Sequence, residues 1–119
     1  MKCLDTYALV EITNGNTNFL KLLDEETVIT DITISEFYGY MFDKHNIQTA
    51  DYWYKKLSFL CVPVSREILV KSVLFRKQNK KQNLSFFDCV GYVFSRENKI
   101  QFVTGDREFK DKEGVLFIK

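Results

Sequence analysis

The amino-acid sequence contains one histidine, one proline and three cysteines. None of its apolar runs reaches the roughly 18 residues that a membrane span needs. Cys3, Cys61 and Cys89 lie far apart, and none belongs to a C-x-x-C pair that would hold zinc or exchange disulfides. We therefore expect buried free thiols in a reducing compartment and a cytoplasmic protein that is not associated with a membrane.

The sequence also lacks a surplus of charge, with 17 Lys and Arg residues against 16 Asp and Glu. A net charge of +1 gives no whole-molecule argument for binding nucleic acid, so such an argument must be local. Hydrophobic residues make up 45% of the 119 residues and aromatic residues 15%. This composition is typical of one folded domain, here residues 1–119, and excludes a disordered chain or a coiled coil.

Short apolar runs alternate with longer amphipathic segments, which is the pattern of a parallel sheet with helical crossovers. We therefore predict an α/β fold whose short strands are buried on both faces. The predicted strands are 2–4, 27–30, 60–64, 100–103 and 115–118. Pro63 falls inside the third of them, which predicts that this strand lies at an edge of the sheet or that Pro63 lies among its first residues.

The longest predicted helix has a single apolar face that runs from Ile34 to His45 with helical spacing. The same spacing from Phe86 to Phe94 predicts a second helix. Further helices are expected at 66–79, 16–23 and 50–58. His45 ends the apolar face, and we interpret it as a packing residue or a contact with the helix dipole rather than as a general base.

Four acidic residues stand at or near predicted helix starts, namely Asp5, Glu36, Asp88 and Asp106. Each has an ordinary structural explanation. Thr33-x-x-Glu36 and Ser85-x-x-Asp88 match capping boxes, and the other two acids match N-caps. Unpaired amides and the helix dipole favour acids at helix starts, so no single one of these residues indicates a function.

Together the four acids indicate a shared site. Strand-to-helix turns of a parallel sheet all lie at its carboxyl edge, where α/β domains bind ligands. Carboxylates crowded at one place repel one another, so either some of them hold protons or a cation neutralises them. Because the chain has one histidine and no paired cysteines, Mg²⁺ or Mn²⁺ is the expected ion.

The segments that carry these acids resemble the PIN domain. They read LDTYALVEI near the start, ISEF in the long helix, FFD at a late helix start and VTGDREF near the end. The resemblance extends from Lys2 to Lys119, and the size is similar to that of VapC-like toxins of toxin–antitoxin pairs. It implies a three-layer fold with the sheet order 3-2-1-4-5 and an acidic site at the carboxyl edge. The helix that carries Asp88 departs from the family in being rich in aromatic residues, with Gly91 as its small residue.

The resemblance assigns Asp5, Glu36, Asp88 and Asp106 as the catalytic acids and Thr104 as the hydroxyl residue that accompanies them. Asp5 and Asp88 are the expected direct ligands of Mg²⁺ or Mn²⁺, and the other two acids are expected to bind through water or a second ion. The implied function is metal-dependent cleavage of RNA phosphodiester bonds, performed by the toxin of a toxin–antitoxin pair.

Other readings remain open. A housekeeping RNA-processing nuclease would carry the same acids, whereas a non-catalytic PIN-fold interaction module would be expected to lose some of them. A phosphatase-like domain is disfavoured because Asp5 is followed by Thr6 and Tyr7 rather than by the second Asp of a D-x-D pair.

Candidate contacts with partners lie outside the acids. Basic residues between Arg66 and Lys81, including Lys71 and Arg76, are candidate RNA contacts, although a solvated helix face would look the same. Arg107 directly follows the last acid and is a further candidate. The aromatic residues 52–54 are interpreted as a protein interface. From the resemblance we also expect a homodimer and an antitoxin partner.

Overall fold

The core of the molecule is a parallel sheet of five short strands. The computed structural model describes residues 1–119, and its strands are β1 (Lys2–Leu4), β2 (Thr27–Thr30), β3 (Cys61–Val62), β4 (Gln101–Thr104) and β5 (Val115–Phe117). They are ordered β3-β2-β1-β4-β5, and every neighbouring pair is parallel. The predicted fold class and strand order are therefore confirmed.

The edge strand β3 is shorter than predicted. It ends at Val62, directly before Pro63, so the prediction that the strand continues to residue 64 was wrong. Proline has no backbone N–H to donate to a neighbouring strand, and it restricts the residue before it. The expected edge position of this strand is confirmed.

Six α-helices and three short 3-10 helices connect the strands. They are α1 (Thr6–Thr13), α2 (Thr17–Leu20), η1 (Lys21–Asp24), α3 (Asp31–Lys44), α4 (Ile47–Leu57), η2 (Ser58–Leu60), α5 (Arg66–Gln78), α6 (Phe86–Glu97) and η3 (Arg107–Phe109). The helix predicted at 16–23 is in fact one α-helical turn that tightens into η1. The helix predicted at 50–58 starts earlier, because the Asn46 side chain accepts a hydrogen bond from the Thr49 N–H (2.8 Å) and caps α4.

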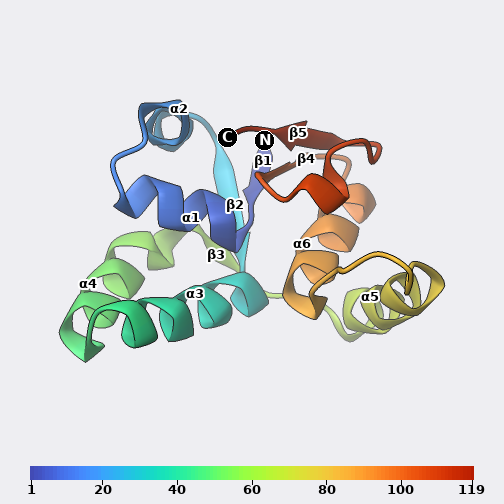
Figure 1. The fold of residues 1–119 in the computed structure, drawn as a ribbon, viewed down its shortest axis with the longest axis horizontal. Coiled ribbons are helices and arrows are strands. Elements are labelled where there is room, and N and C mark those ends of the chain that lie inside the picture. Colours follow the sequence, from blue (N-terminus) through green and yellow to red (C-terminus); the bar gives the residue numbers. More distant parts are fainter.

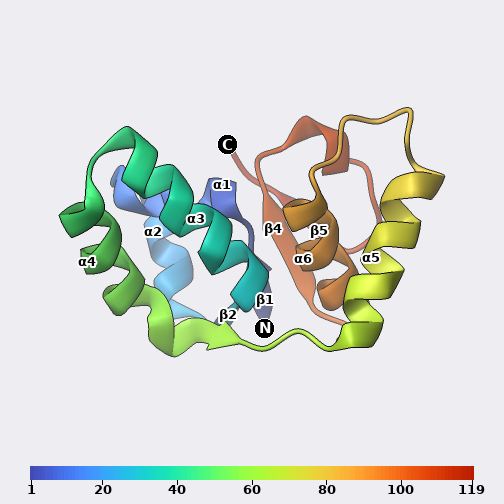
Figure 2. The ribbon, with the colours of Figure 1, turned by 90° about the horizontal axis from the view of Figure 1, so that it is seen from below.

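The helices form two layers with the sheet between them (Figures 1 and 2). Helices α1, α3 and α4 lie on one side, and α5 and α6 on the other. Successive strand residues face opposite layers: Leu4 and Val103 belong to the core on the α1 and α3 side, and Cys3 and Phe102 to the core beneath α6. This explains why the strands are apolar at successive positions.

Helix α3 buries a narrower face than its sequence predicts. Ile34, Phe37 and Met41 are buried, but Phe42 is 50% exposed and His45 is exposed at the C-cap. His45 therefore does not pack in the core, and a contact with the helix dipole remains as the interpretation of this residue. All three cysteines are free, and Cys3 and Cys89 are buried. No helix has the length and apolar character needed to cross a membrane.

Helix α6 approaches the sheet closely at Gly91. A Cβ atom built at this position would lie 2.7 Å from Cε1 of Phe102, a buried ring of β4. Gly91 is therefore the small residue that lets an otherwise aromatic helix pack against the strand beside β1. This contact sets the distance between the sheet and the helix that carries Asp88.

We predict that Gly91→Ala lowers the free energy of unfolding by about 1–3 kcal/mol, because the added methyl group must displace the Phe102 ring or the helix. The matched control is Gly39→Ala in α3, where nothing lies within 4 Å of the added Cβ and the residue is exposed. That change should stabilise the protein by about 0.5–1 kcal/mol through helix propensity. Denaturant titration of both variants measures the two effects, and equal stability of the variants would contradict the packing argument.

Candidate active site

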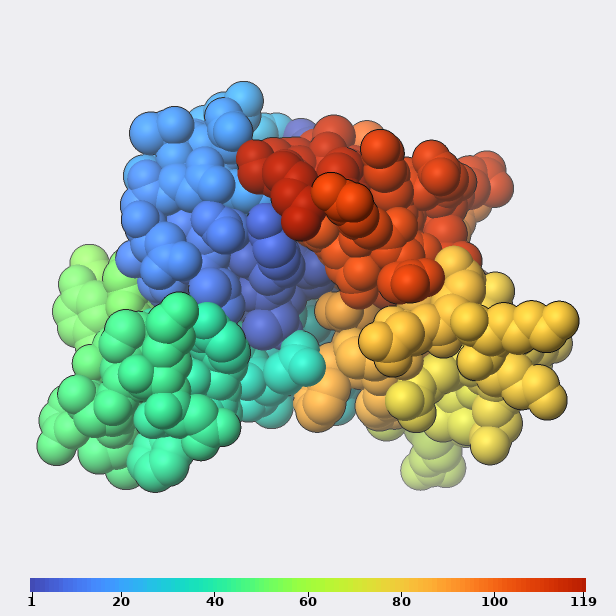
Figure 3. Space-filling model, viewed as in Figure 1, coloured from blue at the N-terminus to red at the C-terminus, as the bar shows by residue number.

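Four segments distant in sequence bring the acidic residues to the carboxyl edge of the sheet. Asp5 directly follows β1, Asp106 follows β4 after Gly105, Glu36 lies on α3 and Asp88 on α6. The backbone N–H of Asp5 donates to the Val103 carbonyl (3.2 Å), which ties the end of β1 to β4. Figure 3 shows the four segments, coloured dark blue, teal, orange and red, meeting around a depression on one face.

Asp5 is the N-cap of α1. Its Oδ1 accepts a hydrogen bond from the Ala8 N–H (2.8 Å), as the sequence suggested for a capping residue. The side chain is only 1% exposed, and its Oδ2 is buried without any hydrogen-bond partner. A capping role therefore accounts for one carboxylate oxygen and leaves the other without a partner.

Asp88 lies in the first turn of α6. The Ser85 hydroxyl caps the helix by accepting from the Asp88 N–H (3.1 Å), so this half of the predicted capping box is present. Burial raises the pKa of the Asp88 carboxyl to about 7, with further contributions from the negative charges of Glu36 and Asp106. Ser85 acts in the opposite direction by hydrogen bonding.

Glu36 is not part of a capping box, and that prediction was wrong. Helix α3 begins at Asp31, and its N-cap is Thr30, whose hydroxyl accepts from the Thr33 N–H (3.0 Å). Glu36 therefore lies in the second turn of α3, too far along to reach back to the cap. Its Oε1 instead accepts a hydrogen bond from the Thr6 hydroxyl at the start of α1.

Thr6 was not assigned from the sequence. Its only signal was its place beside Asp5 in the LDT segment, and nothing local indicates that it reaches a residue on another helix.

Asp106 and Thr104 are arranged by the turn after β4. The Thr104 hydroxyl accepts from the Asp106 N–H (3.0 Å), and Asp106 Oδ1 accepts from the Glu108 N–H (3.0 Å) as the N-cap of η3. Gly105 between them faces the Tyr7 ring, with 2.2 Å between that ring and a built Cβ atom. The turn can therefore lie against α1 only with glycine at this position.

The carboxylates influence one another electrostatically. Burial raises the pKa of Asp5 well above its ordinary value, and the charges of Asp88 and Asp106 raise it further. Thr104 and the Ala8 amide act in the opposite direction. Asp5 is thus coupled to Asp88 and Asp106, and Asp88 to Glu36 and Asp106, so the four acids form one connected group.

The chemistry of this group fits a hard divalent cation. Its donors are carboxylate oxygens, and the unpartnered Oδ2 of Asp5 is a ligand atom with no other role. No three His, Cys, Asp or Glu side chains are arranged as a complete metal site. Mg²⁺ does not need such a cage, because it is commonly held by one or two carboxylates and keeps several waters.

The predicted RNA-contact residues differ in their contacts. Lys71 is paired with Glu97 (2.7 Å), whereas Arg66 and Arg107 are exposed without an ion pair. Arg76 donates from Nε to the Leu84 carbonyl (2.8 Å) and lines a cavity beside α6. In the aromatic cluster 52–54, Tyr52 and Tyr54 are exposed, while Trp53 packs against the core.

The profile of the family described as PIN domain matches residues 2–115. The chain belongs to the PIN-domain family. No curated protein has a significant match to it in sequence.

Three solved structures share its fold over nearly their whole length. One is a toxin–antitoxin complex from Klebsiella pneumoniae, with a TM-score of 0.78, 21% identity and coverage of 98% of this chain and 96% of that one. VapC20 of Mycobacterium tuberculosis, described as a toxin that cleaves the sarcin-ricin loop, has a TM-score of 0.79, 14% identity and coverage of 97% of both chains. FitAcB of Neisseria gonorrhoeae has a TM-score of 0.70, 15% identity and coverage of 99% of this chain and 97% of that one.

The raised pKa values predict how stability without metal depends on pH. A carboxyl whose pKa is about 7 in the folded protein and 3.8 in the unfolded chain binds its proton more tightly when folded. Stability is therefore lost as the pH rises through 7, and Asp5 adds to this trend in the same direction. With chelator present, the melting temperature should be lower at about pH 8 than at about pH 6.

Thermal melts across this range test the argument. Asp88→Asn removes the titrating carboxyl and should flatten the decline, whereas Asp31→Asn, an exposed acid in the first turn of α3, should leave it unchanged. A melting temperature that rises from pH 6 to pH 8 in the parent protein would contradict the assigned shift.

Proposed function

We propose that this protein is a divalent-metal-dependent endoribonuclease and the toxin of a toxin–antitoxin pair. The observation that carries the proposal is the convergence of four carboxylates from separate elements, with one buried oxygen of Asp5 left without a partner. A helix-capping role does not require acids to be brought together against their mutual repulsion. Membership of the PIN family and the likeness to solved toxins support the proposal.

Asp5 and Asp88 would hold the cation directly, with Glu36 and Asp106 binding through water or a second ion. When bound, a divalent ion lowers the pKa of a coordinated water and offsets the charge of the scissile phosphate. Asp88 changes between its protonated and charged forms near neutral pH, so the ion and the proton compete for this carboxyl.

The chain itself orients the donors. The Thr6 hydroxyl holds Glu36 from the neighbouring helix, and the Thr104 hydroxyl holds the backbone of Asp106. Both contacts tie a carboxylate-bearing residue to a second structural element, so the donors are ordered before any ligand arrives. Such supporting contacts are needed because a site displaced by about 1 Å loses much of its activity.

The toxin role implies protein partners. Tyr52 and Tyr54 on α4 are exposed, and we propose that this helix contributes to a surface for an antitoxin. The likeness to a structure described as a toxin–antitoxin complex supports this. Val70 and Leu74 on α5 are also exposed, and they support the proposal of a homodimer. A housekeeping nuclease would have the same acids without these partners.

Asp5→Asn should abolish RNA cleavage and leave the fold intact. Asn is as good an N-cap as Asp, so the bond to Ala8 is kept, while the negative ligand is lost. We expect the rate of cleavage of labelled RNA with Mn²⁺ to fall at least about 100-fold. Replacing residues that only support a metal ligand already lowers metal affinity or activity by roughly 10–100-fold. Asp31→Asn is the control, and a folded Asp5→Asn variant with parental activity would refute the role of Asp5.

Asp88→Asn separates a metal site from simple capping. If Asp88 faces other carboxylates, its neutralisation relieves repulsion, so the metal-free variant should melt at the parental temperature or above. It should also lose most of the stabilisation that millimolar Mn²⁺ gives the parent, because that stabilisation follows affinity for the folded state. If capping were its only role, the variant would be less stable by up to about 1 kcal/mol and its Mn²⁺ response would be unchanged.

A further inference from the structure

A second charged feature adjoins the start of α6, the helix that carries Asp88. The end of α5, the loop 79–85 and the start of α6 enclose a cavity of about 330 Å³. Its lining includes three cationic side chains, Arg76, Lys77 and Lys80, together with Asn83 and the ring of Phe86. The volume is at the lower end of the roughly 300–1,000 Å³ typical of ligand pockets.

The cavity has an uncompensated positive charge. Residues 68–87 contain five Lys and Arg residues and no Asp or Glu. The three salt bridges of the structure involve Lys2, Lys71 and Arg96, so Arg76, Lys77 and Lys80 have no acidic partner. In a chain of net charge +1, this local excess is available to an external anion.

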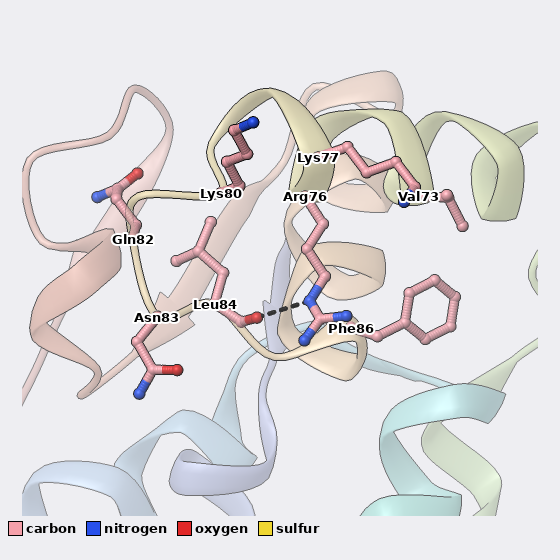
Figure 4. A pocket seen from close by; sticks show the side chains of 8 residues that line it. All are labelled: Val73, Arg76, Lys77, Lys80, Gln82, Asn83, Leu84 and Phe86. Carbon is pink, nitrogen blue, oxygen red and sulfur yellow. Dashed lines mark hydrogen bonds between the residues drawn. The ribbon is translucent and has the colours of Figure 1, made fainter.

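A hydrogen bond from Arg76 gives the cavity a fixed shape. Arg76 donates from Nε to the Leu84 carbonyl (2.8 Å), and Figure 4 shows its guanidinium lying between that carbonyl and the Phe86 ring. In the same view Lys77 extends along α5 toward Val73, and Lys80 points away from Arg76 at the start of the loop (Figure 4). The Nε bond uses one donor of the guanidinium and leaves its two terminal NH₂ groups for a ligand.

The cavity is also joined to the loop that carries Asp106. Gln82 donates from Nε2 to the Glu108 carbonyl (3.2 Å), and its Oε1 accepts from Lys112 Nζ (2.8 Å). On the other side, Phe86 is the first residue of α6 and Asp88 the third. The cavity therefore shares the start of α6 with Asp88 and is bonded through Gln82 to η3, the element that follows Asp106.

We infer that this cavity is a subsite for single-stranded RNA, in which Arg76, Lys77 and Lys80 contact successive phosphates of the backbone and Phe86 stacks on an unpaired base. The inference rests on the proposed nuclease function and assigns where the substrate lies next to the cleaved bond. Cations combined with an aromatic face are how proteins bind single strands without strong sequence preference. An acidic protein segment would use the charges but would leave the ring without a role.

The test measures binding without cleavage. Fluorescence anisotropy with a labelled, unstructured RNA of about 12 nucleotides in chelator reports affinity alone. The variant Lys77→Gln/Lys80→Gln should bind at least tenfold more weakly, and the slope of log affinity against log salt should fall by about 0.7 for each phosphate that the variant no longer neutralises. Lys55→Gln/Lys56→Gln on α4 removes the same charge from the opposite end of the molecule and should bind like the parent protein.

The ring is tested separately. Phe86→Leu keeps an apolar side chain at the start of α6, so the helix should be retained while stacking is lost. We expect weaker binding by about 5- to 100-fold with an unchanged salt slope, because stacking contributes roughly 1–3 kcal/mol per base. With Mn²⁺, both cavity variants should raise KM for this RNA and leave kcat close to that of the parent.

The outcomes separate the two proposals. Cavity variants that bind and cleave RNA like the Lys55→Gln/Lys56→Gln control, in a parent that does both, would overturn the subsite and leave the nuclease proposal standing. A parent that neither binds nor cleaves RNA would overturn both. Loss of binding in the lysine variant with no effect of Phe86→Leu would overturn base stacking and would leave a site that binds the phosphate backbone alone.

Discussion

The crowding of four carboxylates around the buried Asp5 is the constraint on which the rest of this structure depends. The sheet order places β1 beside β4, with Leu4 paired to Val103, so the residues after these strands meet at one edge. Asp5 is buried there with an oxygen that has no hydrogen-bond partner, and its pKa and that of Asp88 are raised. The fold must hold these groups together against a force that would separate them.

The two apolar cores supply that holding force. One lies between the sheet and helices α1, α3 and α4, and the other lies beneath α6. Each acid lies on or beside a helix or strand that one of these cores anchors. The Thr6 hydroxyl on α1 also donates a hydrogen bond to Glu36 on α3. The repulsion between the carboxylates is thus confined to the carboxyl edge of the sheet, whereas the apolar packing that opposes it extends through both helical layers.

Acidic and basic side chains form two separate groups at the start of helix α6. The chain is almost neutral, but its acidic site and its basic cavity adjoin the same helix start, on either side of Ser85 and Phe86. An RNA strand needs both environments, because its phosphates attract cationic side chains while the scissile group needs a cation bound by acids. Gln82, which bonds to Glu108 and Lys112, ties the loop that lines the cavity to the segment that follows Asp106.

The sequence by itself determined the layer architecture, because alternation of short apolar runs with amphipathic segments is imposed by burial and needs no long-range information. It also marked all four acids, and capping chemistry, which is local, correctly placed Asp5 and Ser85. It misplaced the start of α3, since Thr30 and Thr33 are both good caps and only the end of β2 decides between them. Only the tertiary structure decided three contacts: Thr6 donates a hydrogen bond to Glu36, Lys71 pairs with Glu97, and Arg76 bonds to the Leu84 carbonyl at the edge of a cavity. The two residues of each pair lie on different elements of the chain, so no helical or strand periodicity predicts the contact.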